Sequence, residues 1–393
     1  MKYTTTLFAA GALTLLGFGA QAQAPITING QLAATEVAAN GYQLVGRMAG
    51  PRGFGDAGLL SLYAAADANN IYFFLAGTLE NNSGGVSNSL QLFVDRPGAT
   101  GVPAGTRLPV ATGAASTSFA AMTAALDLAA DMAIGIKGTG MGNQVQVDGV
   151  VYTSSTAGTA GVVTGTTPLN TTGTAGTVTA ANASGALAPF VGAQVAYTSS
   201  ANLSSNPGFA SNGNAPSNGL EISMSRSAIG LPATGGMVQI FALMNNQDGG
   251  FLSTDIIPAV TPTPTGNPTN FGNSATVNFT TVPGLQAAML NVSASGLSVV
   301  NSNRRAAAEV ALSVYPNPVL SESTVAYRVQ NAQQHVNIEL TDLMGRRVRT
   351  LFDGQQSVGT QTQKLQAGNV ATGTYLVKVK VGEQVATHKV TLL

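Results

Sequence analysis

Asp127 and Asp131 are the two residues whose type and spacing come closest to a catalytic pair. Residues four apart share one face of a helix, and a weak helical periodicity runs through residues 118–130. Paired carboxylates can hydrolyse glycosides when one is an acid and the other a base or nucleophile. Because the pair directly precedes a predicted strand, we interpret both aspartates as structural and predict no catalytic residue.

Other residue types that serve catalysis are scarce in this chain. There is no Cys, which excludes disulfides, thiolate chemistry and Cys-based zinc sites. His335 and His388 lie among polar neighbours near the C-terminus, where we expect solvent-facing strand positions. Residues 25–303 contain no His and the chain has no G-x-S-x-G elbow, so no Ser-His-Asp triad is expected there. We predict that the protein is not an enzyme.

Binding chemistry has two candidate groups of residues. Carboxylates beside Gly- or Asn-rich turns could hold Ca²⁺, and they are Asp56, Asp67, Asp95 and Asp148. The spaced acidic loop of an EF-hand is missing, so Ca²⁺ is an alternative to the prediction of no metal and no cofactor. Aromatic side chains could form a platform for a sugar, although aromatics also fill β-sandwich cores; the candidates are Tyr42, Tyr63, Tyr72 and Phe54.

The elements that must position these residues are strands. Alternation of apolar and polar residues is clearest in residues 220–225 and recurs at 91–95, 145–148, 238–243 and 276–280. Residues 59–66 and 71–75 flank turn residues and predict a hairpin. The Gly-rich residues 138–142 lead into a strand rather than a helix, so we predict a hairpin turn and not a phosphate loop. The patterns predict an all-β chain that begins with a large antiparallel sandwich.

Composition and charge divide the chain into parts. The 393 residues predict two or three domains, and the 17 basic and 17 acidic residues balance, so no nucleic-acid partner is expected. Residues 25–303 carry six basic and eleven acidic residues, whereas residues 309–393 carry eight and six. We therefore predict one domain over residues 23–295, a linker over 296–309 and a second domain over 310–393. Residues 153–184, which lack large apolar residues and charges, are predicted to form a long loop or a poorly ordered insertion.

The N-terminus has the pattern of an export signal. Lys2 precedes an apolar stretch at residues 7–18, and small residues at Ala20 and Ala22 predict cleavage after Ala22. Residues 1–22 are thus predicted to be a signal peptide. No later run of apolar residues is long enough to span a bilayer, so no transmembrane segment is expected in the mature chain.

The first domain resembles a known group of β-sandwiches. The opening I-T-I-N-G-Q-L at residues 26–32, the hairpin at 62–77 and the strand L-Q-L-F-V-D at 90–95 are similar to elements of the DOMON and family 9 carbohydrate-binding-module group. The resemblance covers residues 26–290 and implies a binding domain, with carbohydrate as the first ligand class. Two features depart from the group: Asn29 replaces the usual Asp, and there is no Trp to clamp a sugar.

The C-terminal region carries the most specific motif. Two prolines stiffen an extended entry, Gly345 follows a strand at a tight turn, and a final long strand should place Val377, Val379 and Val381 in the core beside Tyr375. Residues 310–393 resemble the type A C-terminal sorting domain of the type IX secretion system of Bacteroidota, a small Ig-like sandwich. The matching sorting-signal residues are Tyr315, Pro316, Asn317, Pro318, Gly345, Gly373 and Tyr375.

This second resemblance predicts where the protein goes. It implies Sec and the type IX machinery as partners, passage through the periplasm, and a final location outside the cell or on its outer surface. For the first domain we expect a non-catalytic binding function, adhesive or directed at an extracellular glycan. The alternative is a structural surface or biofilm-matrix protein without a small ligand, and a glycoside hydrolase ranks third.

Overall fold

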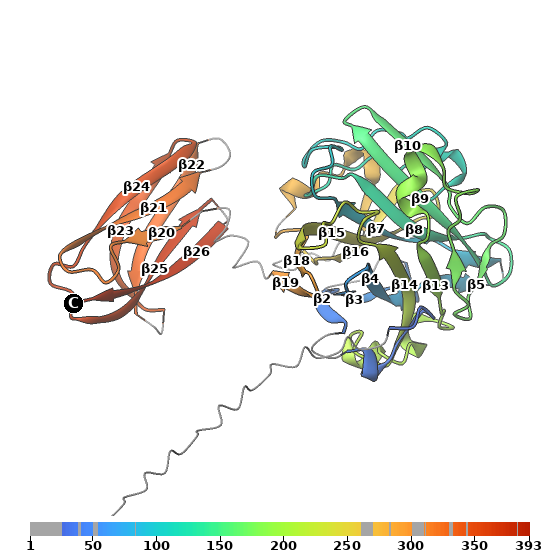
Figure 1. Ribbon diagram of the computed structural model, residues 1–393, viewed down its shortest axis with the longest axis horizontal. Coiled ribbons are helices and arrows are strands. Elements are labelled where there is room, and N and C mark those ends of the chain that lie inside the picture. Colours follow the sequence, from blue (N-terminus) through green and yellow to red (C-terminus); the bar gives the residue numbers. More distant parts are fainter. Residues whose placement is uncertain are drawn as a thin grey trace, which may run out of the picture.

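β-Strands joined by short 3-10 helices make up the regular structure of the protein. The computed structural model describes residues 26–37, 41–49, 54–82, 84–260, 270–282, 284–300, 310, 312–329, 333–342, 345–382 and 384–393. The all-β prediction is confirmed, with a large and a small sandwich in the chain (Figure 1). No helix in these ranges is long and apolar enough to cross a membrane.

Two antiparallel sheets form the large sandwich. The seven-stranded sheet has β1 (Gln31–Leu32) beside β14, and its other strands run in the order β12 (Gly176–Thr177), β13 (Gln194–Tyr197), β14 (Ser217–Ser225), β4 (Asn70–Thr78), β3 (Gly58–Ala66) and β2 (Gln43–Arg47). The ten-stranded sheet has as its main path β10 (Ala157–Val162), β9 (Gln144–Ser154), β8 (Met132–Gly138), β7 (Ser89–Asp95), β15 (Gly235–Asn245), β16 (Phe251–Ile257) and β17 (Asn270–Asn273). Five further strands complete this part: β11 (Leu169–Asn170) on β9, β18 (Ala288–Ser293) on β15 with β19 (Gly296–Val300) beside it, and the ribbon β5 (Glu80–Asn82) with β6 (Gly85–Ser87).

The chain covers both outer faces of this sandwich as well as filling its centre. The main core lies between the sheets and includes Leu220 and Ile222 of β14. A second cluster, with Phe93 and Phe241, packs on the outer face of the ten-stranded sheet. A third, with Tyr42 and Phe74, packs on the outer face of the seven-stranded sheet. Among the described residues, side chains thus pack on the outer face of each sheet.

The Thr- and Gly-rich residues 153–184 are built into the sandwich, so the prediction of a long loop is wrong. They hold the end of β9, all of β10 to β12, and buried side chains of the main core such as Val163, Val178 and Ala183. Strand β10 joins β9 through backbone hydrogen bonds, for example with Ala160 opposite Val150. Such a ladder needs no large side chain, and that is why composition misled the prediction.

The structure also differs from the sequence patterns at three further places. Residues 118–130 contain no helix; the nearest is the 3-10 helix η2 (Ala114–Ser116). In place of a strand at 276–280 there are two 3-10 turns, capped by Asn273 and Asn278, whose side chains accept bonds from nearby backbone N–H groups. The predicted linker begins too early, because Gly296–Val300 is the strand β19, paired with β18. Its remainder, residues 301–309, lies outside the described residues.

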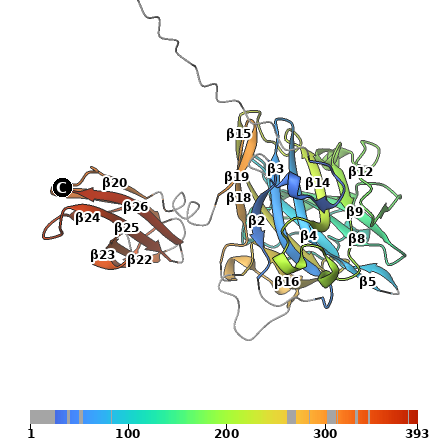
Figure 2. The same cartoon turned by 90° about the horizontal axis from the view of Figure 1, so that it is seen from below.

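The small sandwich is a separate set of two antiparallel sheets, drawn in both views as a body beside the large sandwich (Figure 1, Figure 2). One sheet has the order β20 (Ser313–Tyr315), β21 (Glu322–Val329) and β24 (Gly359–Gln366), and the other has β23 (Arg347–Gln356), β22 (Gln334–Thr341), β25 (Gly373–Val381) and β26 (Gln384–Leu392). Val377, Val379 and Val381 lie in its core, with Tyr375 packed against them, as the alternation predicts.

Candidate functional site

The Tyr-Pro-Asn-Pro segment is where the first strand of the small sandwich changes sheets. β20 pairs with β21, with Val314 opposite Val325. A few residues later Val319 is bonded to the other sheet: its N–H donates to the Thr391 carbonyl at 2.8 Å, and the Leu393 N–H donates to the Val319 carbonyl at 3.0 Å. A segment that leaves one ladder for another has N–H groups without partners, and prolines at 316 and 318 have none to satisfy.

The side chain of Asn317, between the two prolines, takes the place of a strand's backbone beside β26. Its Nδ2 donates to the Lys389 carbonyl at 2.9 Å, and its Oδ1 accepts from the Thr391 N–H at 3.0 Å. The side-chain amide thereby pairs with the edge of β26 as a peptide group would. Ser323 Oγ holds the same segment by donating to the Pro316 carbonyl.

The strand register brings the other sorting-signal residues to this end of the four-stranded sheet. Gly373 lies opposite Leu392, which forms a parallel bridge with Val319. Thr341, opposite Leu376, leads into the turn that contains Gly345. Gly345 has a φ of +80°, which suits glycine, and its N–H donates to the Asp342 carbonyl at 3.0 Å.

Two further contacts concern predicted residues of the small sandwich. The Tyr375 hydroxyl donates to the Ala371 carbonyl at 2.9 Å, fixing the start of β25. His335 is exposed, and its Nε2 lies 2.9 Å from Asp353 Oδ1, whereas His388 is half-exposed. His335 thus lies at a solvent-facing position, as predicted. His388 lies opposite the buried Val377, on the core-facing side of β26 between Ala386 and Val390, so the prediction of a solvent-facing position is wrong for it. The predicted signal peptide, with Ala20 and Ala22, lies outside the described residues.

The large sandwich has a polar pocket at one end of its ten-stranded sheet, here called the amide pocket. Its volume is about 380 Å³. Four segments meet there: the connection from β6 to β7, the end of β8, the β15–β16 loop and the η2 turn. The lining residues are polar or small, and they are Ser87, Asn88, Ala115, Thr117, Lys137, Asn246, Gln247 and Asp248.

Local hydrogen bonds fix the walls of the amide pocket. Gln247 Nε2 donates to the Gly138 carbonyl at 2.8 Å, which ties the β15–β16 loop to the β8–β9 hairpin. Asn88, with a φ of +67°, donates through Nδ2 to Glu80 Oε2 at 3.2 Å. The predicted hairpin turn at residues 138–142 is confirmed and forms one side of this end of the sheet.

A chain of buried polar residues lies beneath the amide pocket. Ser89 Oγ donates to Asn245 Oδ1, and Asn245 Nδ2 donates to Gln91 Oε1 at 3.0 Å. Gln91 Nε2 donates to the Ser118 carbonyl, and the Ser118 N–H donates to Asp148 Oδ2, both at 2.7 Å. All five residues have zero exposed area. Because hydrogen bonds are stronger in a region of low dielectric, this network makes the pocket floor rigid.

Asp148 couples the network to the pocket rim. Burial raises the pKa of its carboxyl group, and bonds from Gln146 and Ser118 and the charge of Lys137 lower it. Lys137 is itself half-buried at the rim. The pocket thus combines amides, hydroxyls and one cation above a fixed floor.

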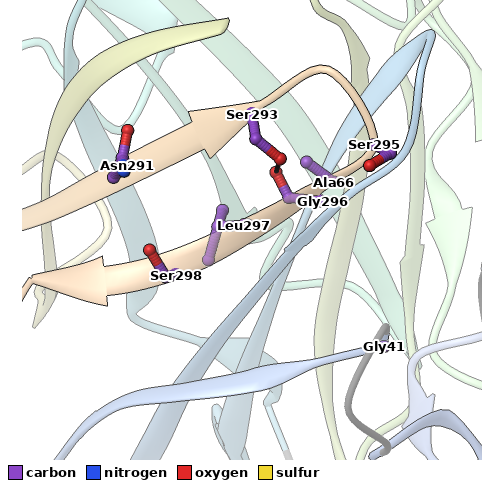
Figure 3. A pocket seen from close by; sticks show the side chains of 8 residues that line it. All are labelled: Gly41, Ala66, Asn291, Ser293, Ser295, Gly296, Leu297 and Ser298. Carbon is purple, nitrogen blue, oxygen red and sulfur yellow. Dashed lines mark hydrogen bonds between the residues drawn. The ribbon is translucent and has the colours of Figure 1, made fainter. Parts of the chain in front are cut away.

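A second depression, the hairpin pocket, lies beside the β18–β19 turn and has a volume of about 250 Å³ (Figure 3). Its lining consists of small and hydroxyl-bearing residues together with Asn291 and Leu297, and Ser293 Oγ is bonded to the Gly296 carbonyl at 3.2 Å. Arg226 holds the turn in place, because its Nη1 donates to the carbonyls of Asp67 and Ala294. No charged residue lines this pocket.

The aspartates singled out in the sequence are not brought together. Asp127 Oδ2 accepts from the Gln286 N–H at 3.0 Å, and the buried Asp131 accepts from the Arg96 N–H at 2.6 Å. Each carboxylate therefore holds a neighbouring segment. The four proposed Ca²⁺ ligands are likewise on separate segments, and no three His, Asp or Glu residues in the described ranges are placed to hold a metal ion.

The candidate sugar platform is also not formed. Tyr42 and Tyr63 are buried, as expected of aromatic residues that fill the core of a sandwich. Tyr72 is half-buried and its hydroxyl donates to Asp67 Oδ2 at 2.6 Å. Phe54 packs edge-on against Phe251, with ring centroids 6.4 Å apart. The three tyrosines pack in the outer layer of the seven-stranded sheet and Phe54 packs against the main core, in agreement with the core alternative.

Glu221 is a buried carboxylate whose role the sequence does not reveal. Its Oε2 accepts from the N–H groups of Asn29 and Gly30 at 2.8 and 2.9 Å, and Tyr42 donates to its Oε1 at 2.8 Å. Burial raises the pKa of Glu221 to about 7 although these bonds lower it, and the charge of Glu36 raises it further. The residue fastens the N-terminal segment across β14. Its only sequence signal is its place in an alternating strand, where a solvent-facing residue is the usual expectation.

Comparison with known proteins identifies one part of the chain. Residues 313–392 match the family described as the secretion system C-terminal sorting domain. No curated protein matches the chain. The resemblance of residues 26–290 to the DOMON group remains a prediction.

Similarity to solved structures is weak. The chain is similar to PorZ, a surface component of the type IX secretion system of Porphyromonas gingivalis, at 22% identity and a TM-score of 0.17, over 27% of this chain and 15% of PorZ. It is similar to latent PorU of the same bacterium at 12% identity and a TM-score of 0.20, over 89% of this chain and 32% of PorU. The chain thus covers less than a third of either protein. Residues 313–392 are a C-terminal sorting domain of the type IX secretion system, and the chain that carries it is exported to the cell surface or the extracellular space.

Proposed function

We propose that the large sandwich is a non-catalytic binding domain that acts outside the cell, with a glycan as its ligand and the amide pocket as its site. The observation that carries this proposal is a pocket of about 380 Å³ lined by amide, hydroxyl and charged side chains. The sorting domain supports the location, since it directs the chain to where extracellular glycans are found.

The chemistry of the pocket suits a polyhydroxylated ligand. Amides both donate and accept hydrogen bonds, and a sugar hydroxyl needs both. Asn88, Asn246 and Gln247 supply this chemistry from two different loops. Lys137 adds a donor for a ring oxygen or a carboxylate. Because the network from Ser89 to Asp148 holds the floor, binding requires little ordering of the protein.

Hydrolysis has less support than binding. A glycosidase of the usual kind needs two carboxyl groups on either side of the scissile bond. The amide pocket is lined by one acidic residue, Asp248, which is exposed and accepts from the Gly250 N–H at 2.8 Å.

The test is a glycan array with the full mature chain, with and without Ca²⁺, and with variants of each pocket. Lys137→Met and Gln247→Ala should each weaken binding of a glycan at least tenfold, which corresponds to about 1.4 kcal/mol. Asn291→Ala, on the wall of the hairpin pocket, is the matched control and should leave the affinity unchanged. Binding that survives both amide-pocket variants but is lost in the control would place the site elsewhere.

A structural surface or matrix protein without a small ligand is the second candidate. It is favoured by the clusters of side chains that cover the outer faces of both sheets. A blank array with folded protein, together with loss of surface-layer or biofilm cohesion on deletion of the gene, would select this candidate.

A further inference from the structure

The last strand of the sorting domain is only partly covered along its outer edge. β26 is an edge strand, and its inner side pairs with β25 over its whole length. Asn317 and Val319 bond the outward backbone groups of Lys389, Thr391 and Leu393.

The geometry of an antiparallel pair shows which further backbone groups of β26 point outward. In an antiparallel pair, alternate residues direct both backbone groups away from the partner strand. Since Thr391 and Leu393 are bonded on the outer side, Thr387 and Val385 share their orientation. Their N–H and C=O groups therefore point away from β25. We call residues 385–389 the open edge.

Charge is divided unevenly over the outer face of this sheet. Lys378 and Lys380 on β25 and Lys389 on β26 are all exposed and lie on the half next to the open edge. Among the described strand residues of this sheet, the carboxylates lie on β22 and β23: Glu339, which is opposite Lys378, is 3.5 Å from Arg347, and Asp353 is 2.9 Å from His335. The open edge thus has a cationic border.

We propose that the open edge of β26 receives an extended acidic segment of a partner protein as an added strand. An unpaired edge is a template for another strand, whose main chain supplies affinity and whose side chains supply specificity. An added strand beside β26 would place alternate side chains next to Thr387 and Lys389, with the β25 lysines one strand further away. Carboxylates at those positions would meet complementary charge.

An anionic lipid surface would use the lysines in a different way. It could contact the three lysines, but it offers no backbone groups to pair with Thr387 and Val385. Because the open edge and the lysines lie side by side, a polypeptide is favoured as the partner over a lipid surface. A variant that removes one of these outward backbone groups therefore distinguishes a polypeptide from a lipid surface.

The experiment measures binding of the full mature chain to three probes. They are a ten-residue peptide of alternating Glu and Thr, its Lys and Thr counterpart, and phosphatidylglycerol vesicles. We expect the acidic peptide to bind and the basic peptide not to bind. Thr387→Pro should lower the affinity for the acidic peptide at least tenfold, because it removes an outward N–H without breaking the bonds to β25.

Charge variants supply an independent arm. Lys378→Glu combined with Lys380→Glu should also lower the affinity for the acidic peptide at least tenfold, and by a larger factor at low salt. Arg328→Glu changes an exposed charge on the other sheet and is the control. The proposal is overturned if the acidic peptide does not bind, if Thr387→Pro binds it normally, or if only vesicles bind and Thr387→Pro leaves them unaffected. Should Thr387→Pro not fold, Val385→Pro replaces it under the same criteria.

Discussion

The same alternation of apolar and polar residues has different outcomes in the two sandwiches. In β14, Leu220 and Ile222 face the main core, and the intervening Glu221 is buried too, on the opposite face. In β25, Val377 and Val379 face the core, and the intervening Lys378 is exposed. The large sandwich lays its own N-terminal segment over the outer face, through Asn29, Gly30 and Tyr42. Alternation thus predicts which side of a strand faces the core, but not whether the other side meets water.

The largest expected effect on stability comes from replacing Glu221 by Ala, and the same replacement of Lys378 is its comparison. Glu221→Ala leaves the N–H groups of Asn29 and Gly30 and the Tyr42 hydroxyl without their acceptor, so we expect a loss of about 3 kcal/mol in the free energy of unfolding of the large sandwich. Lys378→Ala, at an equivalent strand position in the small sandwich, should change stability by less than about 0.5 kcal/mol. Urea denaturation of the full chain, followed by a probe for each sandwich, measures both. Equal effects would contradict the comparison.

The carboxyl groups of the two sandwiches should also differ in pH dependence. Burial raises the pKa of Glu221 to about 7, so the folded state holds its proton more tightly than the unfolded chain does. Its stabilising contribution is complete below its ordinary pKa of 4.5 and is lost as the pH rises to about 7. We expect the large sandwich to lose about 2 kcal/mol across this range.

Glu221→Gln is the control for this dependence, because Gln does not ionise and keeps one acceptor oxygen. The slope of stability against pH between 4.5 and 7 should become flatter in this variant. In the small sandwich, the hydrogen bond from Lys364 lowers the pKa of the exposed Glu322, so its dependence on pH has the opposite sign. An unchanged slope in Glu221→Gln would assign the effect to another group.

A smaller effect is expected at the sheet switch of the sorting domain. Asn317→Ala removes two hydrogen bonds to β26 but leaves the groups of Lys389 and Thr391 near water, so the small sandwich should lose about 1 kcal/mol. The Thr391 amide should then exchange its hydrogen faster. Thr387→Ala, further along the same edge, is the control and should leave that exchange unchanged. Protection of the Thr391 amide in Asn317→Ala would show that Val319 alone holds the edge.

The two regions also differ in how far the sequence could predict them. In the small sandwich, the strand alternation, the Gly345 turn and the core positions of Val377 and Val379 follow from local patterns. In the large sandwich, the hairpin of β3 and β4 follows in the same way. The placement of β10 does not, because backbone pairing with β9 decides it.

The candidate sites show the same limit. The amide pocket joins Asn88, Lys137 and Gln247, which are up to 159 residues apart in the chain, and no local pattern connects them. Asn317 could be singled out by its flanking prolines, but its bonds to Lys389 and Thr391 depend on the complete sheet. Sites formed by distant segments need the tertiary structure.

The smallest expected effect concerns an ion pair that looks strong in the structure. Lys364 Nζ lies 2.7 Å from Glu322 Oε1, but the lysine side chain is 71% exposed. Water already solvates both charges, and two flexible side chains lose entropy in forming the pair, so Lys364→Ala should change stability by less than about 0.5 kcal/mol. The bonds of Glu221 are of similar length, yet they are buried, and their loss is expected to cost several times more. A loss above about 1.5 kcal/mol in Lys364→Ala would mean that the length of a polar contact, rather than its burial, determines how much it contributes to the stability of each sandwich.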